Sequence, residues 1–379
     1  MILCLIKKYY KTIVLLFLFF LIDFFEKKSR WIEQYYSNGI YPKISSIQRK
    51  LTGGLPVSLG DLIYLILGCF FVFKLSVFII KLIKHQQRTA VLKKAVIWSI
   101  NFFLSVYIVF KLIWGFNYSR EGIVYQLKLE NSNYCKEELV ALIEDLIVEA
   151  NDCRSRISDT TLPKMNIDSI FSQTKRAYGS ISKKYFFLTT DRFSIKTSLY
   201  SFMGNYLGYT GYYNPFTGEA QIRDDIPKIL LPFIACHEVA HQLGYASEDE
   251  ANFVGYLVAS QSDNVYFRYS MCLEILDYAL NDLLFKYNED FELKMGVNKR
   301  LQIEDCFDLQ VKKDRKLIKL FFAEHTKNAS RISSAVYDQY LKMNHQNLGI
   351  GSYSKVIQLI LSYKFNIWRD KCKLIEKSK

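Results

Sequence analysis

The sequence predicts an α+β protein that is predominantly helical, with three transmembrane helices followed by a domain that contains a small β-sheet. Two observations support this prediction. The apolar residues of the 379-residue chain are concentrated near the N-terminus, and beyond Asn117 they recur mainly at helical spacing, with only short runs typical of strands. We therefore expect a membrane region over residues 1–116 and a separate domain over residues 117–379.

Three apolar segments form the predicted membrane region, at about residues 9–25, 62–80 and 95–116. The second and third are long enough to cross a bilayer. The first is shorter than the roughly 20 apolar residues that a span requires, and it must include Tyr9 and Tyr10 to approach that length. It follows several lysines and lacks a small-residue cleavage site, which favours an uncleaved anchor over a signal peptide.

Basic residues indicate the orientation of this multi-pass cell-membrane protein. The segment "KLIKHQQRTAVLKK" between the second and third spans carries five lysines or arginines and no acid. By the positive-inside rule this short loop is cytoplasmic, so the domain after residue 117 is expected to be extracytoplasmic. The loop over residues 26–61 carries six basic residues, but these are spread over a longer segment with three acids.

The net charge limits the expected binding partners, and the cysteine content limits the expected disulfides and metal sites. The net charge of +13 suits anionic membrane lipids or envelope polymers. No nucleic-acid-binding motif accompanies it, so we expect no nucleic-acid partner. The eight cysteines include no C-x-x-C pair and show no regular spacing, so neither a disulfide framework nor a thiolate metal site is predicted.

The domain after the spans begins with a helix and continues with short strands. Residues 136–153 read "KEELVALIEDLIVEANDC", with apolar residues at the spacing of an amphipathic helix. The segments "KYFFLTT" (184–190) and "GYYNPFTGEAQI" (211–222) are predicted to be strands with turns. From Leu231 onward the pattern is helical, apart from breaks such as "GIGSY" (349–353).

The segment "FIACHEVAHQLGYASEDEANFVGYLVA" (233–259) carries the chemistry. On a helix, His237 and His241 project from one face, one turn apart, and can share a metal ion. Glu238 lies beside that face, where it can act on a metal-bound water. Gly244 can end this helix with a positive φ angle.

A third ligand is expected on the following helix. Ser247 and Glu250 form an S-x-x-E capping box at its start. Glu248 is the expected ligand because Asn252, four residues further on, shares its helix face and could hydrogen-bond a ligand histidine. Glu250 is the alternative ligand, and His325 or His345 could instead complete an all-histidine site.

These ligands indicate a hydrolytic mechanism in which Zn²⁺ lowers the pKa of its bound water and Glu238 takes the proton and passes it to the leaving amine. The substrate would be a peptide or a protein. A donor to the developing oxyanion is also needed. The sequence leaves four tyrosines open for that role: Tyr209, Tyr212, Tyr213 and Tyr353.

The H-E-x-x-H motif followed by E-x-x-A-N resembles the gluzincin branch of the zincin metallopeptidases. That resemblance implies His237, His241 and Glu248 as zinc ligands, Glu238 as catalytic base and Asn252 as a supporting residue. It also implies that the strand before the motif helix, within 212–222, edges the cleft and pairs with the substrate, although Asn214, Pro215 and Gly218 could make it a simple turn. The interval before Glu248 is shorter than in most gluzincins.

Further segments resemble a bacterial membrane family known as domain of unknown function 3810. They are "WGFNYSR" (114–120), "GYYNPFTGEAQI", "LPFIACHEVAHQLGYASEDEANFVGYL", "FRYS" (267–270) and "YLKMNHQNLGIGSYSKVIQLIL" (340–361). The resemblance implies a membrane protein and leaves the substrate open.

The sequence therefore predicts a membrane-anchored zinc metallopeptidase. The competing class is a non-catalytic envelope protein that uses a zincin-like fold to bind a structural metal or a partner. The number of protein ligands separates the two, because a structural site is usually closed by four and a catalytic site keeps a position open. A third class, a transporter or signalling protein, has support only from Lys74, Lys111 and Asn101 within the spans.

Overall fold

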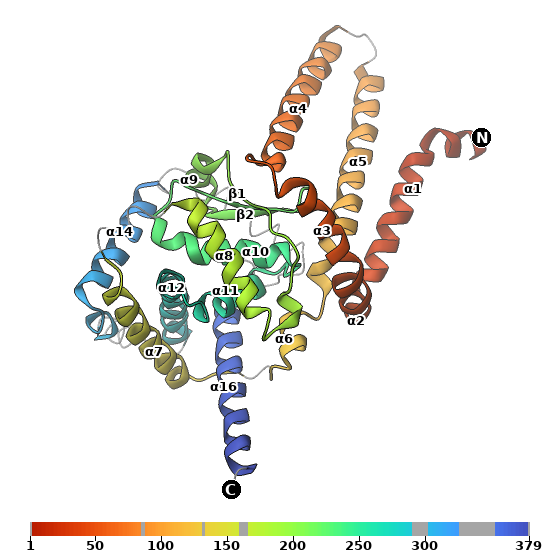
Figure 1. The fold of residues 1–379 in the computed structure, drawn as a ribbon. Helices are drawn as coiled ribbons and strands as arrows, with labels where there is room; N and C mark the ends of the chain where they lie inside the picture. The colour runs from red at the N-terminus through yellow and green to blue at the C-terminus, as the bar shows by residue number, and fades with distance from the viewer. Residues whose placement is uncertain are drawn as a thin grey trace. The chain divides into compact units, whose positions relative to one another are not determined.

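The computed structural model describes residues 2–84, 88–130, 133–158, 166–289, 302–325 and 353–377 (Figure 1). The chain divides into two compact units. Unit 1 comprises residues 1–121 together with the short segment 214–219, and unit 2 comprises residues 122–213 and 220–379. The chain therefore crosses between the units three times, and each unit is described separately below.

Unit 1 consists of helices. In order they are α1 (Ile2–Glu26), α2 (Ser29–Trp31), the π-helix η1 (Ile32–Ile40), α3 (Tyr41–Thr52), α4 (Leu59–Lys84), α5 (Arg88–Ile113) and the 3₁₀-helix η2 (Gly115–Ser119). Helices α4 and α5 lie side by side (Figure 1).

Two helices among the described residues, α4 and α5, are long and apolar enough to span a membrane. The prediction of three transmembrane helices is wrong for the first of them, at about residues 9–25. Helix α1 does form over that segment, but its uncharged run, Thr12–Ile22, is bounded by Lys11 and Asp23. That run is well short of the roughly 20 residues that a span requires.

Helix α1 instead packs along α5 through polar contacts as well as aromatic ones. The Thr12 hydroxyl donates a 2.8 Å hydrogen bond to Asn101 Oδ1, and Lys111 forms a buried ion pair with Glu26. The polar residues that could have indicated a transport pathway in α5 therefore have structural partners on α1. Lys74 of α4 lies over the rings of Phe70 and Trp98.

The turn 214–219 is held to the rest of unit 1 by buried polar groups. The side chain of Glu219, which is fully buried, accepts hydrogen bonds from the backbone N–H groups of Leu59 (3.0 Å) and Gly60 (2.6 Å). Thr217 donates to the same carboxylate. These amides are among the unpaired donors at the N-terminus of α4, so Glu219 caps this candidate membrane helix.

Unit 2 contains a small sheet and a larger set of helices. Its helices are α6 (Gly122–Leu127), α7 (Lys136–Ser155), α8 (Ile167–Ile181), η4 (Phe186–Leu188), η5 (Ser201–Met203), α9 (Gly204–Leu207), η6 (Lys228–Leu230), α10 (Leu231–Gln242), α11 (Glu248–Ser260), α12 (Val265–Glu289), α14 (Leu309–His325) and α16 (Tyr353–Lys377). The structure thus confirms a mainly helical protein with a small sheet.

The three strands are β1 (Ile195–Thr197), β2 (Gly211–Asn214) and β3 (Glu219–Ile222), in the order β1-β3-β2. Strands β1 and β3 are parallel, with Ile195 opposite Ala220. The predicted strand-turn segment 211–222 is confirmed as β2, a turn and β3. The predicted strand at 184–190 is wrong, because its centre forms the 3₁₀-helix η4, and β1 was not predicted.

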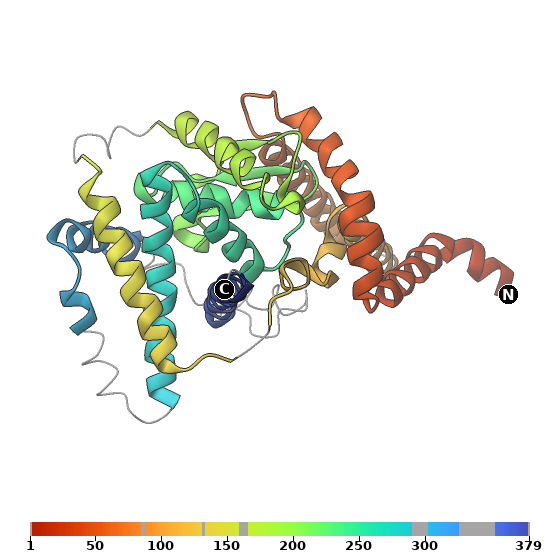
Figure 2. The ribbon, with the colours of Figure 1, turned by 60° about the horizontal axis from the view of Figure 1, so that its bottom comes forward.

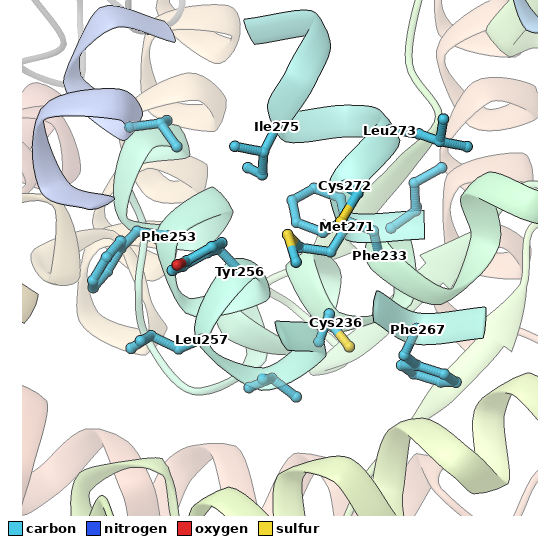
Figure 3. Close-up of a cluster of buried hydrophobic side chains, with 14 of the residues drawn as sticks. Phe233, Cys236, Phe253, Tyr256, Leu257, Phe267, Met271, Cys272, Leu273 and Ile275 are labelled. Atoms are coloured by element: carbon cyan, nitrogen blue, oxygen red, sulfur yellow. The ribbon is translucent and has the colours of Figure 1, made fainter. Parts of the chain in front are cut away.

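The core of unit 2 is formed by α10, α11 and α12. Figure 3 shows Phe233 and Cys236 of α10, Phe253 of α11, and Phe267 and Cys272 of α12 in one buried cluster. Helix α7 packs along α12, as the yellow and cyan helices of Figure 2 show. All six apolar positions that predicted α7 are buried: Leu139, Leu142, Ile143, Leu146, Ile147 and Ala150.

Candidate metal centre

The two histidines of the motif lie on α10, a short helix that is buried almost throughout. Pro232 occupies its first turn, where a missing N–H is tolerated. Gly244 follows its end with a φ angle of 90°, as predicted. Because His237 and His241 are one turn apart, their rings stack edge to face, with 3.1 Å between the two Nε2 atoms.

Glu248, at the start of α11, presents one carboxylate oxygen to each histidine. Its Oε2 lies 3.3 Å from Nε2 of His237, and its Oε1 lies 3.6 Å from Nε2 of His241. In a tetrahedral site with metal–ligand bonds of 2.0–2.1 Å, neighbouring ligand atoms are about 3.3 Å apart. The separation of the two histidine nitrogens, and of each nitrogen from its nearer Glu248 oxygen, is therefore close to that of neighbouring ligands on a tetrahedral metal ion.

A backbone carbonyl sets the tautomer of His241. The Nδ1 of His241 lies 2.7 Å from the carbonyl oxygen of Tyr245, so this nitrogen carries the proton and donates. The lone pair of the neutral ring is then on Nε2, which points toward His237 and Glu248. Tyr245 is itself fixed, because its hydroxyl donates a 2.7 Å hydrogen bond to Gln126.

Glu238 lies beside the two histidines. Ligand atoms of His237, Glu238 and His241 all lie within 4.8 Å of one another, so this group could hold a metal ion. Glu238 is only 3 % exposed, and its Oε2 has no hydrogen-bond partner. Burial raises the pKa of the Glu238 carboxyl to about 7, although the neighbouring histidines oppose the shift.

Glycine at position 211 makes room for this carboxylate. A Cβ atom built on Gly211 of β2 would lie 2.6 Å from Oε1 of Glu238, closer than non-bonded atoms approach. Strand β2 stands at one side of the sheet, next to β3. The backbone of β2 therefore passes directly beside Glu238.

Protonation couples Glu248 and His241 in the metal-free protein. Burial disfavours the charged form of His241, but the hydrogen bond and charge of Glu248 outweigh it and raise the pKa of His241 to about 9. Burial also opposes ionisation of Glu248, yet hydrogen bonds from both histidines hold its pKa well below the usual range. A proton on His241 thus stands in for the positive charge that a metal would bring.

Glu250, the alternative ligand, serves a different contact. Its Oε1 accepts a 2.6 Å hydrogen bond from the backbone N–H of Ile123, at the start of α6. The adjacent Gly122 has a φ angle of 68°, and a Cβ there would overlap the Glu250 carboxylate. The predicted capping box is also absent: Ser247 is the N-cap residue of α11, but its side chain makes no capping hydrogen bond.

The remaining predicted residues that the structure describes make contacts of their own. Asn252 is buried and accepts a long hydrogen bond from Tyr278, while Nδ1 of His237 has no partner. Of the predicted oxyanion donors, Tyr209 donates to the carbonyl of Tyr200, Tyr212 pairs with Ser198, and Tyr213 is on β2. The side chains of Tyr353, His325 and His345 lie outside the described residues.

Sequence reasoning missed the contributions of Gly211 and of the Tyr245 carbonyl. A glycine within a predicted strand is a known sign of close approach by another group, so Gly211 carried a usable signal. The Tyr245 carbonyl carried none, because any residue supplies a backbone oxygen. The sequence also could not show that Glu248 faces the histidines and Glu250 does not, because Glu250 is held by the distant backbone N–H of Ile123.

Comparison with known proteins identifies a family whose description names no activity. The family described as Protein of unknown function (DUF3810) matches residues 36–361. No curated protein and no solved structure matches the chain.

Proposed function

The chain belongs to the DUF3810 family, whose description assigns no activity, and we propose from its metal centre that it is a membrane-anchored zinc metallopeptidase with an extracytoplasmic site. One observation carries the proposal. The Nε2 atoms of His237 and His241 lie 3.1 Å apart, and Glu248 presents one carboxylate oxygen to each of them, at 3.3 and 3.6 Å. The buried carboxylate of Glu238 lies beside the histidines with an unpartnered oxygen.

The donor set favours zinc over other cations. Two imidazole nitrogens and one carboxylate suit Zn²⁺, whereas Mg²⁺ and Ca²⁺ prefer oxygen ligands throughout. A zinc ion held by these residues would supply Lewis-acid chemistry to a carbonyl group and to water. Among the described residues, His237, Glu238 and His241 form a group that could hold a metal ion, and the Glu248 carboxylate adds oxygens 3.3 and 3.6 Å from the two histidines. With Glu238 as the base, this leaves three protein ligands, fewer than the four that usually close a structural site.

Glu238 is the proposed general base. Its pKa of about 7 is close to the value at which a base is both ionised and effective near neutral pH. We assign the unpartnered Oε2 to accept a proton from the attacking water and to return it to the leaving nitrogen. Burial keeps this carboxylate from being solvated by bulk water.

Strand β2 is the proposed docking edge for the substrate backbone. Its first three residues are half-buried, whereas β3 is buried throughout. An extended peptide that paired with this edge would lie beside Gly211 and so beside Glu238. The turn that follows β2 does not compete with this role, because it begins only at Asn214.

The competing function is a non-catalytic envelope protein that binds metal for structure. It shares the ligands but does not require a base at Glu238. The Glu238→Gln variant therefore separates the two functions, since it removes the base and changes the volume of the side chain little.

The test uses the full chain in nanodiscs, with zinc content measured by mass spectrometry and cleavage measured on a peptide library. We expect one zinc per chain and cleavage that is lost in Glu238→Gln with zinc retained. Glu144→Gln, on the exposed face of α7, is the matched control and should behave as the unmodified protein. Zinc binding without cleavage in the unmodified protein would refute the peptidase, and absence of zinc would refute the site.

A further inference from the structure

Helix α3 of unit 1 is amphipathic in the reverse sense to a helix of a water-soluble protein. Its buried residues are mostly polar: Ser45, Arg49 and Thr52, together with the ring of Tyr41 at its first position. Its outward face carries an apolar stripe, with Ile47 exposed by 61 % and Leu51 by 70 %. Single exposed aliphatic residues are ordinary, but here they form one stripe at helical spacing while the polar residues point inward.

The buried polar face is fixed by specific hydrogen bonds. Arg49 donates to Ser45 within the helix. Gln48 donates a 2.8 Å hydrogen bond to the carbonyl of Pro215, and Thr52 donates to the carbonyl of Thr217. Rolling α3 to hide its apolar stripe would break these bonds and leave buried carbonyl groups unpaired. The stripe is therefore held outward.

We propose that the outward face of α3 lies in the interface of an anionic lipid bilayer. The apolar stripe continues on both sides of the helix, with Ile40 before it and Leu55 after it, and both are exposed. A helix that buries such a stripe at the boundary of the acyl chains lies in the plane of the membrane. This role does not depend on the metal centre.

Charge on the same face favours lipid headgroups over a protein surface. Lys43 and Lys50 flank Ile47 at helical spacing and are both exposed, and neither forms an ion pair with any described residue. Helix α3 contains no acidic residue. Lysines at the edge of an embedded stripe can reach lipid phosphates with their ammonium groups while their carbon chains remain in the apolar layer. In a two-fold dimer through this face, the lysines of both copies would be brought together.

The position of α3 in the chain supports the same assignment. Helix α4, a candidate span, begins at Leu59, shortly after α3 ends at Thr52. Exposed aromatic rings, Trp31 and Tyr35, precede α3 in the same unit. Aromatic side chains are enriched at the membrane–water boundary. The bilayer that receives α4 is thus available to α3.

Depth-dependent fluorescence quenching tests this proposal in the full chain. Ile47→Cys and Leu51→Cys would be labelled with bimane, with the exposed native cysteines replaced by serine, and reconstituted into vesicles that contain phosphatidylglycerol. We expect quenching by acyl-brominated lipid to exceed quenching by aqueous iodide several-fold. Val148→Cys on α7 is the matched control, since Val148 is 69 % exposed on a helix rich in acids, and iodide should dominate there.

Two results would overturn the proposal. If iodide dominates at positions 47 and 51 as it does at 148, the stripe faces water. If neither quencher reaches the label, a protein surface covers the face instead. The lysines are tested separately: in Lys43→Gln/Lys50→Gln, lipid quenching should lose its dependence on phosphatidylglycerol, whereas unchanged dependence would remove the anionic preference.

Discussion

Glu248 and Glu250 occupy the same first turn of α11 and yet serve different parts of unit 2. The Glu248 carboxylate spans both imidazoles, whereas the Glu250 carboxylate caps the N-terminus of α6 through Ile123. Sequence could propose both acids because both sit beside the motif helix. It could not separate them, because the deciding contact comes from backbone more than a hundred residues away.

Replacing Glu248 should weaken metal binding, whereas replacing Glu250 should not. We expect Glu248→Gln to weaken zinc affinity by more than the roughly 10- to 100-fold typical of changing a residue that only supports a ligand. Glu250→Gln should keep zinc affinity and lower the free energy of unfolding by about 1 kcal/mol, because a charge-assisted hydrogen bond becomes neutral. Competition with a fluorescent zinc chelator and thermal unfolding would measure the two effects. Equal zinc affinity in both variants would contradict the assignment.

Zinc binding should release a proton from His241. In the metal-free protein the pKa of His241 is raised to about 9, so its ring is protonated at pH 7, and zinc requires the neutral ring. Apparent affinity should therefore rise with pH up to about 9. Calorimetry at pH 7 in buffers of different ionisation heat would count the released protons. Heats that do not depend on the buffer would contradict this coupling.

The same shift predicts how the metal-free protein responds to pH. A raised pKa stabilises the fold fully below the unfolded value of about 6.5, and the contribution is lost as pH rises through about 9. The His241–Glu248 pair therefore favours the metal-free fold at pH 6 over pH 10. Thermal unfolding with and without chelator would show a larger benefit from zinc at high pH, and a benefit that falls instead would contradict this sign.

Gly211 is predicted to determine where Glu238 can lie. In Gly211→Ala the new methyl group would meet Glu238 Oε1, so the base should be displaced. We expect at least about a tenfold loss in kcat/KM, in line with a misplaced catalytic group, with zinc content unchanged. Gly179→Ala is the control, because a Cβ there meets nothing within 4 Å. An unchanged rate in Gly211→Ala would show that Glu238 tolerates the shift.

At the scale of elements, apolar periodicity predicted the positions of helices that have one buried face. Helix α7 begins at Lys136 as expected, and α10 and α11 meet at the predicted Gly244 turn. Prediction failed for short elements whose conformation depends on their neighbours. Strand β1 exists because it pairs with β3, and "KYFFLTT" forms η4 although its composition is typical of a strand.

The N-terminus of α4 is capped by Glu219, which is distant in the sequence. Glu219→Gln should lower the free energy of unfolding by about 1–3 kcal/mol, because hydrogen bonds to a charged acceptor are weakened in a buried position. Thermal unfolding of the full chain in detergent would measure the change, with Glu144→Gln as control. A midpoint that matches the control would contradict a capping role.

At the scale of the whole molecule, the sequence predicts one more candidate membrane span than the structure supports. Apolar composition selected α4 and α5, which form helices long and apolar enough to span a membrane because both runs are long and nearly uncharged. It also selected α1, where composition resembles a span but charged residues shorten it. The membership of residues 214–219 in unit 1 could not be predicted, since it depends on hydrogen bonds to residues far away in the chain.

The orientation of the chain in the membrane remains a prediction that labelling can test. The basic residues at the end of α4 and the start of α5 predict that the connection between these helices lies in the cytoplasm. An impermeant thiol reagent applied to intact cells should therefore label Phe186→Cys, at an exposed position of unit 2, and should spare Lys84→Cys. Labelling of Lys84→Cys alone would reverse the orientation.

The threefold crossing between the units has a consequence for release of the protein from the membrane. A protease that cut after Glu121 would free a fragment that still carries the turn 214–219. In that fragment Glu219 would have lost the amide groups of Leu59 and Gly60. Shedding would thus damage the hairpin whose first strand contains Gly211. If unit 1 anchors the chain in a membrane, it would thus also contribute to the structure around Gly211.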